Sequence, residues 1–264
     1  MKLSHVIFGF IVILVVLPLV CMFVGERMLD PFGIDPSLAF AAPGEDALAG
    51  RDKLGRDYLA RVLLGAGQSV LAAGLAAATA LVIAVTVGVV AGWRADSPAD
   101  AVLGYFKSLL FTMPFFLVAV AVGTVLQAGL FGIYVIVGLV MWAPAARIAR
   151  AETVRVRSAP SAVAARAYGF TPFQRFRRVF LPQVTLAPAV STLYLLPELL
   201  GLDVGLSFFG LGSTPPNPTL GRLVFEGIAS FPTAWWLVVV PGTVLVSVCL
   251  ACYALLHAIP ATRS

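Results

Sequence analysis

Two carboxylates stand in an otherwise apolar stretch, where carboxylates can carry protons or bind cations. Glu198 and Asp203 lie within residues 184–209, whose other members are mostly aliphatic, aromatic or small. If this stretch crosses a bilayer, a charge at its centre costs about 3 kcal/mol even on the mildest scale, so such residues usually face water. We therefore predict that Glu198 and Asp203 line a path or gate. A second interpretation, of equal weight, is that Asp203 lies at the membrane surface, where water solvates it.

The remaining reactive side chains fit no catalytic or redox pattern. Cys249 and Cys252 are three residues apart, on one face of a helix, but they lie in an apolar run without a second cysteine pair. They are interpreted as buried structural cysteines. The sequence contains no Gly-x-x-x-x-Gly-Lys-Ser/Thr phosphate loop and no His/Cys cluster. We predict no catalytic residue, no metal site and no cofactor, so energy must come from another subunit or an ion gradient.

The composition is that of an integral membrane protein. Of the 264 residues, 60% are hydrophobic and 12% are charged, and the mean hydropathy is +0.97. Soluble domains carry about twice as many charged residues. Eight of the fifteen arginines lie between Arg147 and Arg178, against one acid, Glu152. Positive charge concentrates in cytoplasmic loops, so the net charge of +5 indicates topology and not nucleic-acid binding.

Inside this basic segment the sequence predicts a helix, a tight turn and a second helix. Ser161–Tyr168 is rich in alanine and favours a short helix. Gly169 suits the left-handed conformation that ends one. Thr171 and Gln174 have the spacing of a capping box, with Pro172 at the first helical position between them. Small alanines on the first helix would let it sit deep in a groove of a partner protein. The alternative is an ordinary basic loop whose hairpin touches only lipid headgroups.

The spacing within this hairpin is specific. Two adjacent alanines are followed by a glycine four residues after the second, and later by an aliphatic residue and Leu-Pro. This resembles the loop by which permease subunits of binding-protein-dependent ABC importers dock onto their ATPase. The resemblance implies that residues 147–183 form an ATPase-coupling loop, with these residues in it: Ala164, Ala165, Arg166, Gly169, Val179, Leu181 and Pro182.

Further segments in the same order extend the resemblance over residues 50–221. Residues 50–66 are similar to a segment that is common in the dipeptide, oligopeptide and nickel branch of these permeases. Asp203 with residues 206–212 is similar to a signature in which glutamate is usual at the Asp203 position. The resemblance, to the C-type member of the permease pair, implies an all-α type I ABC importer permease fold of about six transmembrane helices. It implies transport of di- or oligopeptides, with nickel or metal chelates as the second class.

The same resemblance implies partners. These are a second homologous permease subunit, two ATP-binding subunits that hydrolyse ATP, an extracytoplasmic substrate-binding protein and the lipid bilayer of a bacterial inner membrane. One departure concerns the coupling loop, because the family usually carries an acid immediately before the two alanines. Val163 stands there, and Ser158 and Pro160 occupy positions that are often acidic. The partner groove is therefore expected to be more acidic or more apolar than usual.

The elements that must position these residues are apolar stretches long enough to cross a bilayer. We predict an uncleaved N-terminal anchor and extracytoplasmic segment at residues 1–65, and a transmembrane domain at residues 66–257, with both termini in the cytoplasm. Residues 50–66 are also interpreted as an amphipathic interfacial segment, with Leu59, Val62 and Leu63 facing lipid. The six predicted spans are residues 6–24, 70–93, 108–126, 133–146, 184–209 and 235–256.

A transporter of another class remains an alternative at this point. An ion-coupled secondary transporter would use Glu198 and Asp203 for protons or sodium. Against it, the chain shows no inverted repeat, a frequent feature of such transporters, and its most patterned residues lie in a cytoplasmic loop. Finding an ATPase partner, or none, separates the two classes.

Overall fold

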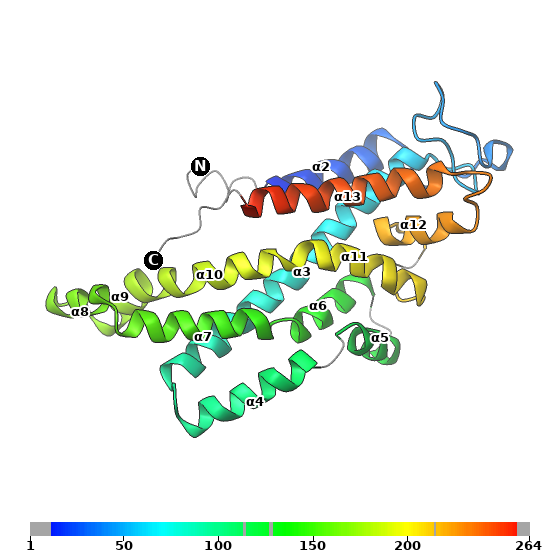
Figure 1. The fold of residues 1–264 in the computed structure, drawn as a ribbon. Helices are drawn as coiled ribbons and strands as arrows, with labels where there is room; N and C mark the ends of the chain where they lie inside the picture. Colours follow the sequence, from blue (N-terminus) through cyan, green and yellow to red (C-terminus); the bar gives the residue numbers. More distant parts are fainter. Residues whose placement is uncertain (1–11, 113–114, 127–128, 214, 258–264) are drawn as a thin grey trace. The chain divides into compact units, whose positions relative to one another are not determined.

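The computed structural model describes residues 12–112, 115–126, 129–213 and 215–257. Within these ranges the chain forms helices and two isolated bridges, and no strand (Figure 1). The all-α class predicted from the sequence is confirmed. The chain divides into two compact units, one of residues 1–74, 123–133 and 196–264, and one of residues 75–122 and 134–195.

The first unit is built around the N-terminal half of α3 (Tyr58–Trp93), α11 (Leu195–Phe208), α12 (Leu220–Ile228) and α13 (Trp236–His257). It also holds helical residues 12–28, which include α2 (Leu17–Phe23), and a 3-10 turn at Pro36–Leu38. The hydroxyl of Tyr58 donates to the carbonyl oxygen of Leu237 at 2.7 Å. The apolar core consists of Ala49, Tyr58, Val62, Ala66, Leu220, Leu223, Ala234, Trp236 and Leu237.

The structure corrects the interfacial interpretation of residues 58–66. These residues are the first turns of α3, which begins well before the predicted start at residue 70. Val62 is only 1% exposed, and Leu59 packs against the same core. The expected contact of Val62 with lipid is wrong because leucine and tryptophan side chains of α12 and α13 cover that face. The local pattern of a helix does not reveal such distant partners.

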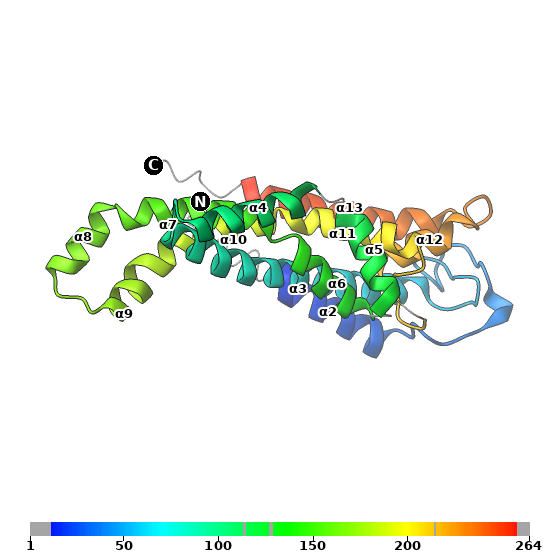
Figure 2. The same ribbon diagram turned by 90° about the horizontal axis from the view of Figure 1, so that it is seen from below.

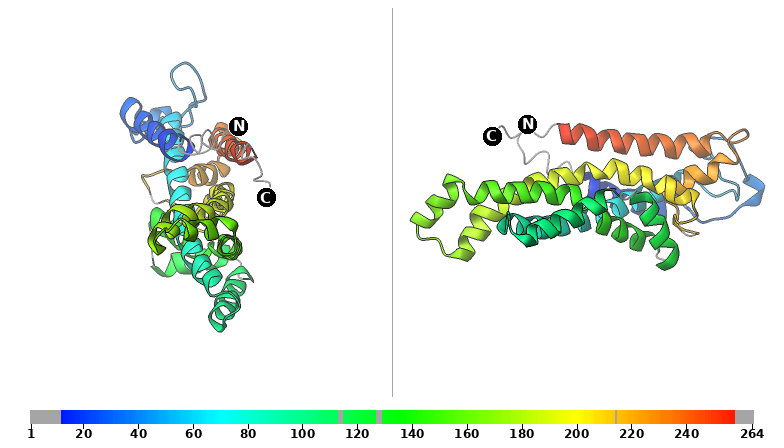
Figure 3. Two further views of the ribbon diagram at one scale, coloured as in Figure 1. Left: turned by 90° about the vertical axis from the view of Figure 1, so that its left-hand side faces the viewer. Right: turned by 60° about the horizontal axis from the view of Figure 1, so that its bottom comes forward.

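The second unit holds the C-terminal half of α3, α4 (Pro98–Thr112), most of α6 (Leu130–Val140), α7 (Ala143–Arg157) and α10 (Leu181–Leu193). Helices α7 and α10 lie side by side (Figure 3). Along the chain, α7 is joined to α10 by α8 (Pro160–Ala167), α9 (Pro172–Arg175) and a π-helical segment, Phe176–Phe180. Figure 2 shows that α8 and α9 extend beyond the ends of α7 and α10.

Small residues let α3 and α7 approach closely in this unit. A Cβ added at Gly88 would lie 2.4 Å from the Cβ of Ala149, and one added at Gly92 would lie 2.6 Å from that of Thr153. Neither glycine can carry a side chain without moving a helix. Contacts of this kind are typical of helices packed in membranes, where apolar burial alone does not drive association.

Several helices are long and apolar enough to cross a membrane, so the protein is a multi-pass membrane protein. Among the described residues these are Tyr58–Trp93, Phe173–Phe208 and Trp236–His257, and α6 with α7 forms a fourth candidate bent by 46°. The bend follows from Pro144 in the first turn of α7, because proline cannot continue the hydrogen bonds of a preceding helix.

The first and third predicted spans lie partly outside the residues that the structure describes. The first includes residues 6–11, and only its later part is described, as helical residues 12–28. The third is divided between α4 and α5 (Phe115–Leu126), and residues 113–114 between them lie outside the described ranges. Up to four of the six predicted spans are thus recovered by length and composition.

Candidate functional site

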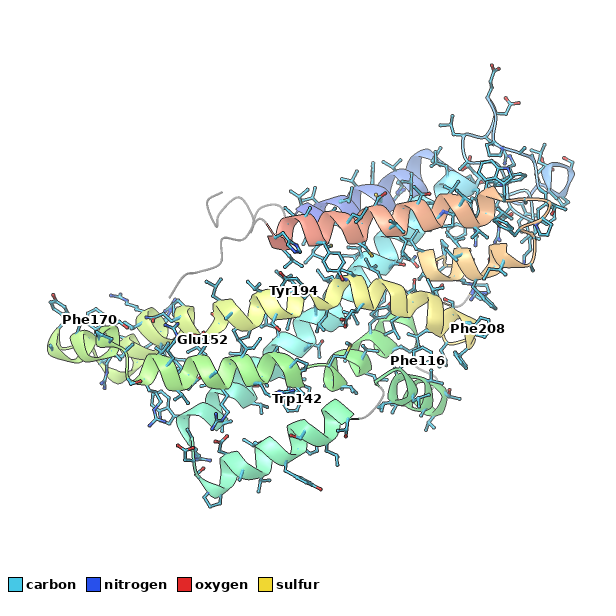
Figure 4. The ribbon with its side chains drawn as sticks, viewed as in Figure 1. Phe116, Trp142, Glu152, Phe170, Tyr194 and Phe208 are labelled. Carbon is cyan, nitrogen blue, oxygen red and sulfur yellow. The ribbon has the colours of Figure 1, made fainter. Side chains whose placement is uncertain are left out.

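The helical hairpin formed by α8, the following turn and α9 has the geometry predicted from its sequence. Gly169 adopts φ +73°, the left-handed conformation that glycine accepts without steric cost. The amide of Tyr168 donates to the carbonyl of Ala164 at 2.9 Å, and the amide of Phe170 donates to that of Ala165 at 3.1 Å. These bonds satisfy the last carbonyls of α8. Figure 4 labels Phe170 in the turn.

The start of α9 is fixed by side chains in both directions. The amide of Gln174 donates to Oγ1 of Thr171 at 3.3 Å. The amide of Thr171 donates to Oε1 of Gln174 at 3.0 Å. The predicted capping box is therefore present. Since α8 ends and α9 begins through specific bonds, the turn between them has one defined geometry.

The hairpin presents two different faces. Ala165 is only 5% exposed and Phe180 only 6%. Both line an open cavity of about 790 Å³, together with side chains of α7 such as Val156. Ala164 is exposed, as are Tyr168 at 80% and Phe173 at 69%. The two adjacent alanines therefore differ, because Ala165 packs inside the chain and only Ala164 is available to a partner.

The remaining residues assigned to the coupling loop lie on α8 and on the returning helix. Val179 is half-buried in the π-helical segment. Leu181 and Pro182 open α10, where Pro182 occupies the first turn. Arg166 lies on α8, and its side chain is outside the described part of the structure. All of the predicted residues thus belong to one continuous segment, α8 to α10.

Arginines of α7 connect this helix to α4 and to the end of α3. Nε of Arg150 donates to Oδ1 of Asp100 at 2.8 Å. Nη1 of Arg157 donates to the carbonyl oxygens of Gly92 at 3.0 Å and Trp93 at 2.7 Å, and its guanidinium lies 5.5 Å from the Trp93 ring centroid. The two bonds from Arg157 satisfy carbonyl groups at the C-terminal end of α3. Sequence reasoning missed Asp100, because nothing local marks a partner 50 residues away.

Asp203, in the first unit, is buried and accepts three hydrogen bonds. It is 1% exposed. Its Oδ2 accepts from Oγ of Ser69 and from the amide of Gly221, both at 2.9 Å. Its Oδ1 accepts from Oγ1 of Thr219 at 3.1 Å. The alternative of a solvated surface residue is wrong, because the side chain is enclosed by three helices.

The Asp203 carboxylate faces the N-terminus of α12. Thr219 is the N-cap of this helix, and its Oγ1 accepts from the amide of Arg222. Oγ of Ser69 accepts from the amide of Leu220 at 2.9 Å. A carboxylate at a helix N-terminus is stabilised by free amides and by the helix dipole. Thr219 was detectable in the sequence as a capping residue, whereas nothing marked Ser69.

Glu198 is not brought to this cluster. It is exposed, whereas Asp203 is buried on the same helix, α11. Five residues along a helix turn the side chain by about 140°, so the two carboxylates point to different sides. The two predicted path residues therefore do not form a pair.

A second charged cluster in the first unit joins the segment before α3 to α12. Nε of Arg56 donates to Oδ2 of Asp52 at 2.6 Å, and Nε of Arg61 lies 3.4 Å from the same oxygen. Nη2 of Arg61 is 3.9 Å from Glu226. The Arg61 side chain is only 3% exposed. This cluster anchors residues 52–61, which the sequence marks only by their similarity to a segment of related permeases.

The sequence of this chain is similar to those of known transport proteins. The family described as "Binding-protein-dependent transport system inner membrane component" matches residues 84–263. The chain is 28% identical over 196 residues to the dipeptide transport system permease protein DppC of Lactococcus lactis, covering 74% of this chain and 57% of that relative. It is 29% identical over 246 residues to the oligopeptide transport system permease protein OppC of Escherichia coli, covering 91% and 81%.

A putative peptide transport system permease protein of Brucella suis is 29% identical over 206 residues, covering 78% of this chain and 69% of the relative. The chain thus spans little more than half of the Lactococcus relative and more of the other two. The family match, which includes the whole α8–α9 hairpin, covers more than half of the chain. The chain therefore belongs to the family of binding-protein-dependent transport system inner membrane components.

Proposed function

We propose that this chain is a permease subunit of an ABC importer. It pairs with a second homologous permease, and the two enclose the translocation path. Two separate ATP-binding subunits hydrolyse ATP, and an extracytoplasmic binding protein delivers the substrate. In this role the chain itself carries no catalytic residue. The observation that carries the proposal is the α8–α9 hairpin, whose geometry is defined by Gly169 and the capping box and which lies within the family match.

The coupling is mechanical in this proposal. The hairpin is held in one geometry at both helix ends, and the chain continues from α9 as one helical stretch, Phe173–Phe208. A rigid element attached to a long helix transmits a displacement instead of absorbing it. ATP-driven movement of the ATP-binding subunits would therefore shift α10 and α11. Ala164, Arg166 and Gly169 act at the contact, while Ala165, Val179, Leu181 and Pro182 keep the hairpin attached to its helix.

The substrate class follows from the relatives. Three similar proteins are a dipeptide, an oligopeptide and a putative peptide transport permease. We therefore assign di- or oligopeptides to this chain, with nickel or metal chelates as the second class. Asp203 fixes the N-terminus of α12 and so supports a gate, and the exposed Glu198 is placed along the path. Both termini and the hairpin face the cytoplasm of a bacterial inner membrane.

Reconstitution of the complete complex tests this function. The chain, its partner permease and the two ATP-binding subunits are placed in vesicles, with the binding protein outside. We expect labelled peptide to accumulate inside only when ATP is supplied to the ATP-binding subunits. An ion-coupled secondary transporter would instead take up substrate along a proton or sodium gradient without any ATP-binding subunit, and that result would overturn the proposal.

A further inference from the structure

The basic segment between residues 147 and 178 divides into two functional halves. The arginines of α7 have partners within the chain. Arg150 pairs with Asp100 and Arg157 with carbonyls of α3, and Arg155 pairs with Glu152, 2.6 Å away. These charges stabilise the chain itself and leave little for a partner protein.

The arginines that follow α9 differ. Arg177 and Arg178 are exposed, and neither has an ion-pair partner in the part of the chain that the structure describes. The sequence contains no acid between Glu152 and Glu198, so no residue adjacent along the chain can neutralise them. Exposed aromatic side chains lie close to them along the chain, namely Tyr168 at 80% and Phe173 at 69% on the hairpin and Phe176 at 41% beside the two arginines. Arginine and tyrosine are enriched among energetically dominant interface residues, and phenylalanine is enriched in the cores of interfaces.

The position of the hairpin favours a protein partner over lipid headgroups. The helical stretch Phe173–Phe208 contains 36 residues, which corresponds to about 54 Å at 1.5 Å per residue. A bilayer has a hydrocarbon core of about 30 Å and headgroup layers of roughly 5–8 Å on each side. A transmembrane helix needs about 20 residues, so this stretch is about 16 residues longer than one crossing requires. The extra length allows its hairpin end to extend beyond the headgroups.

We infer that the groove of the ATP-binding subunit that receives this hairpin is acidic at its rim and apolar at its base. Carboxylates at the rim pair with Arg177 and Arg178, and the apolar base receives Tyr168 and Phe173. This inference rests on the proposed function. The physical reason is that an arginine that enters an interface without a partner loses its hydration with no compensation. The planar guanidinium also matches a carboxylate in a bidentate pair.

Charge reversal in the complete complex tests this inference. Arg177→Glu combined with Arg178→Glu should weaken binding of the ATP-binding subunit more than tenfold in detergent. Changing acids of the groove to lysine should restore it. The neutral pair Arg177→Gln and Arg178→Gln should bind with intermediate strength and a smaller salt dependence, because fewer charge pairs are screened. Arg155→Glu, a single charge reversal at an exposed site outside the hairpin, should leave binding within twofold.

The outcomes distinguish this inference from the function on which it rests. If the parental chain binds its ATP-binding subunit and the double reversal binds equally well, the acidic groove is refuted and the permease function stands. If the double reversal acts only in vesicles that contain anionic lipid, headgroups are the partner and the inference also fails. If the parental chain recruits no ATP-binding subunit, the proposed function itself fails.

Discussion

At the scale of single residues, Asp203 is the side chain whose environment the structure defines most completely. It is a buried carboxylate with donors from α3, from the N-cap of α12 and from the α12 backbone. Sequence reasoning selected Asp203 because a carboxylate in an apolar stretch is costly. It could not identify the donors, because Ser69 is 134 residues away and the contact exists only in the folded chain.

We expect Asp203→Asn to reduce peptide uptake while the complex still assembles. The amide retains the shape of the carboxylate, but its NH₂ group replaces an acceptor and must face a donor. Leaving a buried donor unpaired costs about 1–3 kcal/mol, so thermal unfolding should also occur at a lower temperature. Glu45→Gln, at an exposed position, is the control. Unchanged uptake and unchanged unfolding of Asp203→Asn would show that the carboxylate supports neither α12 nor transport.

A second residue-scale prediction concerns the close approach of α12 to α11. A Cβ added at Gly221 would lie 2.4 Å from the backbone carbon of Asp203, and backbone cannot move aside as a flexible side chain does. Gly221→Ala should therefore destabilise the protein by about 1–3 kcal/mol. Gly201→Ala on α11, where a Cβ meets nothing within 4 Å, should be neutral or slightly stabilising. Equal unfolding temperatures for the two variants would contradict the packing.

At the scale of elements, the hairpin was predictable because its chemistry is local. A glycine with positive φ and a reciprocal capping pair lie within six residues of one another, and the sequence displays both. The face that each alanine presents was not predictable. Ala165 is buried against side chains from α7 and the returning helix, so only the tertiary structure distinguishes it from Ala164.

Gly169→Val tests the turn itself. No atom lies within 4 Å of a Cβ added at Gly169, so the substitution acts through the backbone alone. A β-branched residue at φ +73° costs about 1 kcal/mol or more. We expect the variant to insert normally but to lose peptide-stimulated ATP hydrolysis in vesicles. Gly169→Asn, which tolerates positive φ better, should retain most of it. Full stimulation in the valine variant would mean that the turn geometry does not matter for coupling.

At the scale of the whole molecule, composition predicted a multi-pass helical protein correctly. Apolar length identifies spans because the bilayer requires it. It does not locate breaks, so the fourth predicted span became two helices that meet at 46° beside Pro144. The boundary of α3 was likewise misplaced, since its first turns are covered by helices distant in the sequence.

Orientation is predicted for the whole chain from the basic loop. Ser161 and Asn217 are both exposed, and each can be replaced by cysteine in a background that lacks Cys21, Cys249 and Cys252. Ser161→Cys should react with an impermeant thiol reagent only after the membrane is permeabilised. Asn217→Cys should react in intact cells or spheroplasts. The reverse pattern of labelling would refute the proposed topology.

The central claim is that the exposed face of the hairpin couples ATP hydrolysis to transport. Its most direct test is peptide-stimulated ATP hydrolysis by the reconstituted complex carrying Ala164→Arg. Ala151→Arg, at an exposed position of α7, is the matched control. We predict that Ala164→Arg inserts and folds but loses the stimulation or the ATP-binding subunit, because added bulk blocks a close interface, while Ala151→Arg keeps both. Parental stimulation and parental binding in Ala164→Arg would contradict the claim.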